Sequence, residues 1–311
     1  MKIVFMGTPE FAVHTLESLY KKGYDISLVI TQKDKPRGRG KKLLPTPVKV
    51  KSQELGLEIY QPEKVNCEDS LNRLKELSPD FIVVAAYGQI LKKELLGIPK
   101  YGCINVHASL LPKYRGAAPI NWAVINGEKE TGITIMEMNV GLDSGDILLQ
   151  GKVAINEEDD SETIHDKLAH LGGKLIVEAL DSIKENKISK IPQDDSQASY
   201  APMIKKDLGK INWSDIGLNI KNLTRGLKPW PYAYTLYDGM NIKIHKVSLC
   251  EKFKDGKDGE VVKVSDDGIF VNCQDSCVII EELQFPGKNK VRVKDFLRGN
   301  AFKLGYVFEY L

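Results

Sequence analysis

The sequence predicts an α/β fold in two parts: a doubly wound, mainly parallel N-terminal sheet and a smaller C-terminal β-barrel. Three observations support this prediction. Up to about residue 155, short apolar runs alternate with longer amphipathic stretches, which is typical of strand–helix units. Residues 189–210 are polar, contain two prolines and show no hydrophobic period, so they indicate a linker. Beyond them, short runs alternate with turn residues, which favours antiparallel strands.

The expected strands of the N-terminal part are short apolar runs separated by segments long enough for helices. Such spacing allows neighbouring strands to be parallel. The runs cover residues 2–6, 26–30, 81–86, 102–106 and 132–138, and a further strand starts near Ile147. From Ser161 onward, apolar residues at steps of four and three predict one face of a long helix that closes this part. They are Ile164, Leu168, Leu171, Leu175 and Ala179.

The C-terminal part is predicted to be a barrel because its apolar runs are short and end at turns. The runs cover residues 234–237, 241–249, 259–264, 268–273 and 277–282. Asp238-Gly239 and Asp267-Gly268 are hairpin signals, and we expect a helix near residues 293–302. The resulting domain limits are 1–189, a linker at 190–207, and 208–311.

Composition excludes several classes of protein. The 311 residues include 44 Lys and Arg against 42 Asp and Glu, so a uniformly basic nucleic-acid binder is not expected. The longest strongly apolar run, residues 81–87, is far shorter than the ~18 residues that a membrane span needs. The N-terminal apolar run is too short for a signal peptide. Five scattered cysteines without a Cys-x-x-Cys pair indicate reduced thiols, and we expect a cytoplasmic protein.

The strand expected at residues 102–106 leads into the first candidate site residues. Side chains two apart share a strand face, so Asn105 and His107 point the same way. They lie at the carboxyl end of the strand, where open α/β sheets bind ligands. An amide and an imidazole there can both donate hydrogen bonds to an oxygen that becomes negative in a carbonyl reaction. Taken alone, the pair favours a simpler interpretation, a polar strand end capped by a histidine.

Two irregular loops strengthen the functional interpretation. Residues 109–116 (SLLPKYRG) follow the strand directly and combine rigid and permissive residues. Residues 141–146 (GLDSGD) form a second glycine-rich loop. Either Asp143 or Asp146 can be a simple turn residue. If Asp143 approaches His107, it can orient the ring and relay protons.

The sequence gives little support for a bound dinucleotide or metal. The turn Gly7-Thr-Pro-Glu10 opens a helix after a strand, but it lacks the three-glycine dinucleotide fingerprint. The histidines show no spacing typical of metal ligands. We therefore expect no nicotinamide cofactor and no metal.

Basic residues cluster in three places although the net charge is only +2. Residues 33–51 contain eight basic residues and one acid, a local charge of +8 − 1 = +7. The linker region adds Lys205, Lys206 and Lys210, and residues 288–303 form the third cluster. Basic loops are commonly just solvated surface. Three clusters in a nearly neutral protein suggest a polyanion partner with salt-sensitive affinity.

Several stretches together carry a resemblance to a known family. They are GTPEFA at 7–12, GRGKK at 38–42, PTPVK at 45–49, AYG at 86–88, TGIT at 131–134, GLDSGD at 141–146 and, most specific, GCINVHASLLPKYRGAAP at 102–119. With them the chain resembles the methionyl-tRNA formyltransferases over essentially its whole length. The resemblance implies a Rossmann-like N-terminal domain and an OB-like C-terminal barrel that binds tRNA.

The resemblance also implies roles for three groups of residues. Asn105, His107 and Asp143 correspond to the catalytic residues of folate-dependent formyl transfer. The folate-binding surface corresponds to Ala86, Tyr87, Gly88, Gln89, Ile90, Leu91, Ser109, Leu110, Leu111 and Pro112. The tRNA-binding residues correspond to Arg37, Arg39, Lys41, Lys42, Lys205, Lys206 and Lys210, with the first loop entering the acceptor arm of the tRNA.

The implied reaction passes the formyl group of 10-formyltetrahydrofolate to the α-amino group of methionine on initiator tRNA, for translation initiation, without a metal. Asn105 and His107 would hydrogen-bond the oxygen that becomes negative when the amine attacks. Asp143 would hold His107, accept the proton that the amine loses and deliver one to the folate nitrogen. Two alternatives stay open. One is another folate-dependent formyltransferase that acts on a small amine such as an amino-sugar nucleotide, and the other is a non-enzymatic RNA-binding protein.

Overall fold

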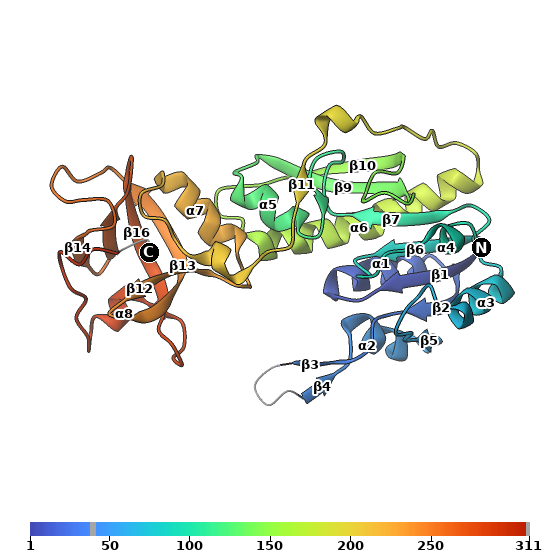
Figure 1. The fold of residues 1–311 in the computed structure, drawn as a ribbon, viewed down its shortest axis with the longest axis horizontal. Coiled ribbons are helices and arrows are strands. Elements are labelled where there is room, and N and C mark those ends of the chain that lie inside the picture. The colour runs from blue at the N-terminus through green and yellow to red at the C-terminus, as the bar shows by residue number, and fades with distance from the viewer. Residues whose placement is uncertain (38–41, 309–311) are drawn as a thin grey trace. The chain divides into compact units, whose positions relative to one another are not determined.

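The chain forms two compact units, and the computed structural model describes residues 1–37 and 42–308 of it (Figure 1). The first unit comprises Met1–Pro119, Glu130–Ala154 and His165–Ala201, and the second comprises Ile120–Lys129, Ile155–Ile164 and Pro202–Leu311. The chain passes between the units more than once, and the last crossing follows Ala201, inside the segment expected to be a linker. The domain limits given by the sequence stay a prediction.

A mixed sheet forms the framework of the first unit. Its strand order is β10-β9-β7-β6-β1-β2-β5. From β7 to β5 in this order the strands pair in parallel, whereas β9 and β10 are antiparallel. The strands are β1 (Lys2–Gly7), β2 (Asp25–Ile30), β5 (Ile59–Tyr60), β6 (Phe81–Ala85), β7 (Cys103–His107), β9 (Glu130–Glu137) and β10 (Ile147–Ala154). The predicted doubly wound, mainly parallel sheet is confirmed.

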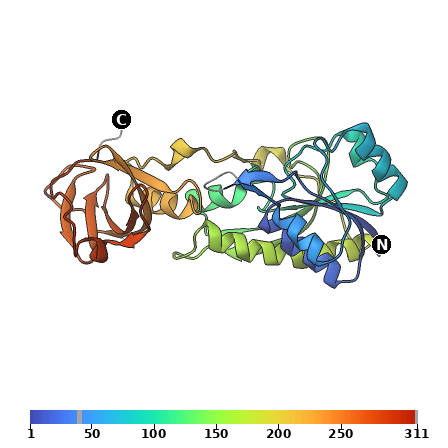
Figure 2. The ribbon, with the colours of Figure 1, turned by 90° about the horizontal axis from the view of Figure 1, so that it is seen from below.

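Helices cover both faces of this sheet (Figure 2). They are α1 (Glu10–Lys21), α3 (Glu68–Leu77) and α6 (Ser161–Lys184). On one face, Leu71 and Leu74 of α3 pack into a buried apolar cluster with strand residues. On the other face α6 comes very close to β7, because Gly172 has no side chain. A Cβ at Gly172 would lie 2.8 Å from Cγ1 of Val106. The long helix predicted from Ser161 is confirmed.

Shorter elements lie between these strands and helices along the chain, and the helix at residues 119–125 belongs almost wholly to the second unit. They are α2 (Pro47–Glu54), α4 (Lys93–Leu96), α5 (Pro119–Ile125), β3 (Lys35–Arg37), β4 (Lys42–Leu44), β8 (Arg115–Gly116), β11 (Tyr200–Ala201) and the 3-10 turn η1 (Asp195–Gln197). Strand β11 pairs in parallel with β8. The first part of the expected linker is therefore held against residues 115–116, and this pairing matters for the site described below.

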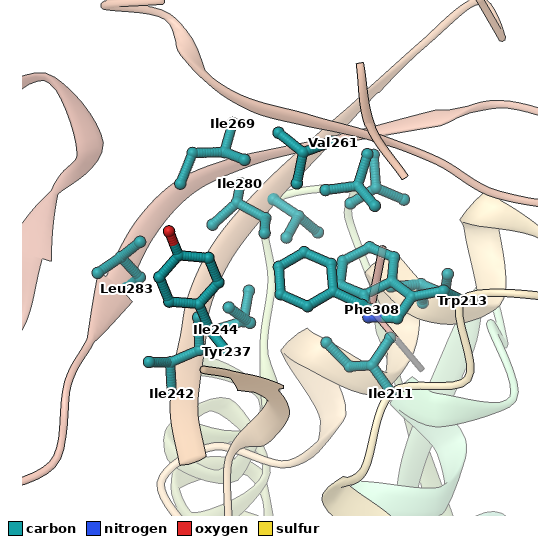
Figure 3. Close-up of a cluster of buried hydrophobic side chains, with 14 of the residues drawn as sticks. Ile211, Trp213, Tyr237, Ile242, Ile244, Val261, Ile269, Ile280, Leu283 and Phe308 are labelled. Atoms are coloured by element: carbon teal, nitrogen blue, oxygen red, sulfur yellow. The ribbon is translucent and has the colours of Figure 1, made fainter. Parts of the chain in front are cut away.

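The second unit is built around an antiparallel sheet with the order β12-β13-β16-β15-β14, and β17 pairs with β16. Its elements are η2 (Lys206–Gly209), α7 (Gly217–Gly226), β12 (Ala233–Tyr237), β13 (Met240–Cys250), β14 (Val261–Ser265), β15 (Gly268–Asn272), β16 (Cys277–Gln284), β17 (Val291–Arg292) and α8 (Val293–Phe296). Trp213, Tyr237 and Phe308 meet in its apolar core (Figure 3). The predicted strands and hairpins of this part are confirmed.

Two helices of the second unit differ from the prediction. The helix expected at residues 293–302 is only α8, which ends at Phe296, because Gly299 and Asn300 are poor helix formers. Helix α7 was missed. Its sequence GLNIKNLTRG contains two glycines and two asparagines and begins without a side-chain cap, so its local signal is weak. Burial of Ile220 against the sheet stabilises this helix despite its low intrinsic propensity.

Within residues 1–37 and 42–308, every helix is too short or too polar to cross a membrane.

Candidate active site

The carboxyl end of β7 carries Asn105 and His107. Both are buried, with 8% and 6% of their surfaces exposed. Within the described residues, the Asn105 carboxamide has no hydrogen-bond partner in the protein, so its amide hydrogens are free for a ligand. Cys103 lies on the same strand, and burial raises the pKa of its thiol to about 12. Cys103 is therefore no nucleophile at neutral pH.

The His107 ring is anchored through one of its nitrogens. Nε2 lies 3.1 Å from the backbone oxygen of Tyr114. Because a carbonyl oxygen only accepts, this hydrogen bond places a hydrogen on Nε2. The other nitrogen, Nδ1, lies 3.7 Å from Oδ2 of Asp143. That separation is too long for a direct hydrogen bond and short enough for a water or a reacting group to bridge the two side chains.

Asp143 is held in place by a backbone amide. Its Oδ2 accepts a hydrogen bond of 2.9 Å from the N–H of Gly116. Its own backbone has φ +46°, in the left-handed region, which is uncommon for residues with a side chain and in which aspartate is enriched. Such conformations persist where the surroundings impose them, and they are common at active sites. The structure thus brings Asp143 to His107, while Asp146 takes part through its backbone oxygen, which accepts a hydrogen bond from the N–H of Glu137.

The loop after β7 supplies groups that the sequence analysis did not single out. The backbone oxygen of Tyr114 orients His107, and the N–H of Gly116 orients Asp143. Tyr114 has φ +61° and Gly116 has φ +120°. The only sequence signal for this role was the irregular run KYRG, because main-chain hydrogen bonds do not depend on residue type.

The segment 86–91, predicted to bind folate, follows β6. Ala86 has φ +44° and Gly88 has φ +89°, so the chain turns sharply there, and both residues are exposed. Ile90 is 82% exposed. The partly or fully buried side chains are those of Tyr87, Gln89 and Leu91. Because β6 and β7 are parallel neighbours, the turn after β6 lies at the same end of the sheet as Asn105.

The second predicted folate segment, residues 109–112, is largely internal. Ser109 is fully buried, and its Oγ donates to the backbone oxygen of Lys113 at 2.6 Å. The N–H of Leu111 donates to Oγ1 of Thr134. Leu111 is buried, whereas Leu110 and Pro112 are half-buried. Ser109 therefore shapes this loop from inside.

The basic residues predicted to bind tRNA have different surroundings. Arg39 and Lys41 lie outside the described residues, and Arg37 and Lys42 are described only as backbone positions in β3 and β4. Lys205 and Lys206 are exposed, and Lys210 is half-buried. Three other members of the basic run are paired with acids in ion pairs, which lowers the charge available to phosphates: Lys33 with Glu63, Lys49 with Asp34, and Lys51 with Glu17 and Glu54.

In the part of the chain that the structure describes, no three His, Cys, Asp or Glu side chains are grouped to hold a metal ion.

Comparison with known proteins identifies the family. Residues 1–180 match the family described as formyl transferase, and residues 203–301 match the formyl transferase C-terminal domain. Methionyl-tRNA formyltransferase from Caldanaerobacter subterraneus subsp. tengcongensis is 52% identical over 99% of this chain and 100% of its own length. The chain belongs to the methionyl-tRNA formyltransferase family. The protein of that name from Geobacter metallireducens is 49% identical over 98% of this chain and 97% of its own length.

Solved structures resemble this family member in fold. An N-formyltransferase from Helicobacter canadensis, in complex with folinic acid and dTDP-3-aminofucose, has a TM-score of 0.66 at 20% identity. It covers 90% of this chain and 98% of its own. HypX from Aquifex aeolicus with tetrahydrofolic acid has a TM-score of 0.64 at 16% identity, covering all of this chain and 51% of its own. At these identities the likeness shows the fold alone.

Proposed function

We propose that this protein transfers the formyl group of 10-formyltetrahydrofolate to the α-amino group of methionine on initiator methionyl-tRNA, in the cytoplasm. The observation that carries the proposal is the cluster of Asn105, His107 and Asp143 at one buried strand end. It lies in a chain about half identical, over full length, to proteins with this name. N-formylmethionyl-tRNA for translation initiation is the product.

Asn105 and His107 stabilise the negative charge that develops on the formyl oxygen. Asn105 has free amide hydrogens at this end of β7. His107 donates its Nε2–H to the backbone oxygen of Tyr114, so Nδ1 is the ring nitrogen that can contact the reacting groups. Donation from Nδ1 then requires the imidazolium form, whose positive charge Asp143 stabilises from 3.7 Å. Removing one such donor typically costs 10²–10³ in turnover.

Asp143 accepts the proton that the amine loses as its nitrogen bonds to the formyl carbon. It then delivers a proton to the folate nitrogen, whose bond to the formyl carbon breaks, so that tetrahydrofolate leaves. Oδ1 of Asp143 makes no hydrogen bond within the described residues, whereas Oδ2 is held by Gly116. One oxygen therefore anchors the carboxylate and the other can take a proton. The gap between Asp143 and His107 also gives room for a bridging water.

The described surface fits a folate donor beside these residues. Ala86, Gly88 and Ile90 are exposed on the turn that leaves β6, next to the end of β7. The exposed side chain of Ile90 and the turn at residues 86–88 offer an apolar surface against which a flat ring system can pack. When bound, the folate supplies the activated formyl group, and the protein residues position it and stabilise charge.

Two alternatives compete with this function. A formyltransferase acting on an amino-sugar nucleotide is consistent with the fold shared with the Helicobacter enzyme, but the near-50% relatives carry a different name. A non-enzymatic RNA-binding protein would not need an aspartate held beside a buried histidine at a strand end. The basic loops support tRNA as substrate in preference to a small amine.

The deciding experiment offers radiolabelled 10-formyltetrahydrofolate with three acceptors: initiator methionyl-tRNA, elongator methionyl-tRNA and an amino-sugar nucleotide. We expect label in acid-precipitable initiator tRNA, with much less in the elongator. Equal labelling of both tRNAs would remove initiator selectivity from the proposal. Label only in the sugar nucleotide, or in none, would overturn it.

A further inference from the structure

Gln193 lies in the segment that the sequence predicts to be a linker, yet its side chain holds the loop of Asp143. Nε2 of Gln193 donates to the backbone oxygen of Asp143 at 2.8 Å and to that of Gly145 at 2.7 Å. Gln193 is half-buried. Two short hydrogen bonds from a single amide group therefore fix the main chain on both sides of residue 144.

Arg115 fixes the other end of the same amide. Its guanidinium donates to Oε1 of Gln193 from Nε at 3.1 Å and from Nη2 at 2.8 Å. Only 5% of the Arg115 side chain is exposed, and Nη2 also donates to Oδ1 of Asp195 at 2.8 Å. A guanidinium only donates and a backbone oxygen only accepts. The Gln193 amide can satisfy both neighbours in one orientation only, oxygen toward Arg115 and nitrogen toward the loop.

Asp143 needs external support of this kind. Its backbone lies in the left-handed region at φ +46°, which is uncommon for residues with a side chain although aspartate adopts it more often than most. The N–H of Gly116 fixes its carboxylate, and Gln193 fixes its main chain. Both supports belong to one piece of structure, because β8, which contains Arg115 and Gly116, is paired with β11 at the end of the same segment.

We propose that Gln193 is a positioning residue for Asp143, and that Arg115 sets the orientation of the Gln193 amide. The inference rests on the proposed function, in which Asp143 accepts a proton. Gln193 touches no reacting atom. Since a displacement of about 1 Å can cost ~10² in rate, removing its two donor hydrogen bonds should lower kcat by roughly 10–100-fold. The KM values for both substrates should change by less than about threefold.

Gln193→Glu is the discriminating variant. It keeps the size of the side chain and its interaction with Arg115, now as an ion pair, but presents an oxygen where two backbone oxygens need a donor. The matched control is Gln197→Glu, the same change four residues along, at an exposed side chain that donates to Asp194. We expect the control to keep wild-type kcat, KM and melting temperature.

A double-mutant cycle separates positioning from a general structural role. If Gln193 acts through Asp143, Gln193→Glu should change kcat less than about twofold when Asp143 is already Asn. A purely structural role predicts the same fold-change in both backgrounds, and that additivity would overturn the proposal. Full kcat in the single variant Gln193→Glu would overturn it as well. If Gln193→Glu lowers the melting temperature markedly, Gln193→Met takes its place in the same cycle.

Crystal structures of the two variants give a readout independent of activity. Residues 141–146 should be displaced in Gln193→Glu and unchanged in Gln197→Glu, and an unmoved loop in the former would refute the positioning role. An inactive wild-type protein would instead contradict the proposed function. The two failures are therefore distinguishable.

Discussion

Gly116→Ala is the substitution that tests most directly how the loop after β7 supports the site. Gly116 has φ +120°, a conformation that residues with a side chain rarely adopt. A Cβ there would lie 2.8 Å from the backbone oxygen of Ala201, and main-chain atoms of a paired strand cannot easily move aside. The same residue donates its N–H to Asp143. The change therefore affects stability and catalysis together.

The expected decrease in stability has two parts. Holding alanine in a sparsely populated backbone region costs about 1–3 kcal/mol, and forcing extra volume into a tightly packed position costs about 1–3 kcal/mol more. Together they give about 2–6 kcal/mol, or a fall of at least roughly 4 °C in the melting temperature of the first unit. The shift of the Gly116 amide should also lower kcat, by roughly tenfold or more, because one support of Asp143 is disturbed.

Gly23→Ala is the matched control. Gly23 also has a positive φ, +82°, but no atom lies within 4 Å of the position its Cβ would take. It should therefore show only the conformational cost, about 1–2 kcal/mol, and wild-type kcat. Calorimetry and single-turnover formylation measure both effects. Equal melting temperatures for the two variants, or full kcat for Gly116→Ala, would refute the reasoning.

Three further predictions concern the site and the tRNA. Asn105→Ala or His107→Ala should each lower kcat by roughly 10²–10³ with little change in substrate affinity; near-normal turnover in a folded variant would contradict their role. Asp143→Asn should lower kcat by roughly 10²–10⁴, and Asp146→Asn should lower it much less. The opposite order of severity in steady-state assays would assign the catalytic role to Asp146 instead of Asp143. Replacing Arg39, Lys41 and Lys42 together by Ala should weaken tRNA binding and spare folate binding. It should also flatten the slope of log affinity against log salt by roughly 0.7–0.9 for every phosphate that is no longer neutralised. Unchanged slopes in a salt titration would exclude the loop that contains these residues from the tRNA interface.

The sheet of the first unit could be predicted because its signal is local. Each strand is a short apolar run, and β1, β2, β6, β7 and β9 start and end within about two residues of the predicted limits. The apolar face of α6 is equally regular. By contrast, α7 was missed because its propensity is poor and its stability comes from burying Ile220 against strands that follow it in the chain.

Some features of the site could likewise be predicted from local sequence, and others could not. The alternation along β7 was enough to place Asn105 and His107 together, and the loop at residues 141–146 was an evident candidate. That Nε2 of His107 is held by Tyr114, leaving Nδ1 toward Asp143, follows only from the folded structure. A backbone oxygen is present at every residue, so the sequence cannot show which one a histidine meets.

By itself the sequence determined the succession of strands along the chain, the long helix, the two-part organisation and the common strand face of Asn105 and His107. The resemblance to a known family added Asp143 to the predicted site. Only the tertiary structure decided that Gln193, fifty residues from Asp143, holds the loop of that aspartate. The physical reason is the range of the interactions. Hydrophobic burial leaves a period that is readable within about ten residues, whereas a glutamine in a polar segment looks the same whether water or a distant backbone oxygen accepts its hydrogens.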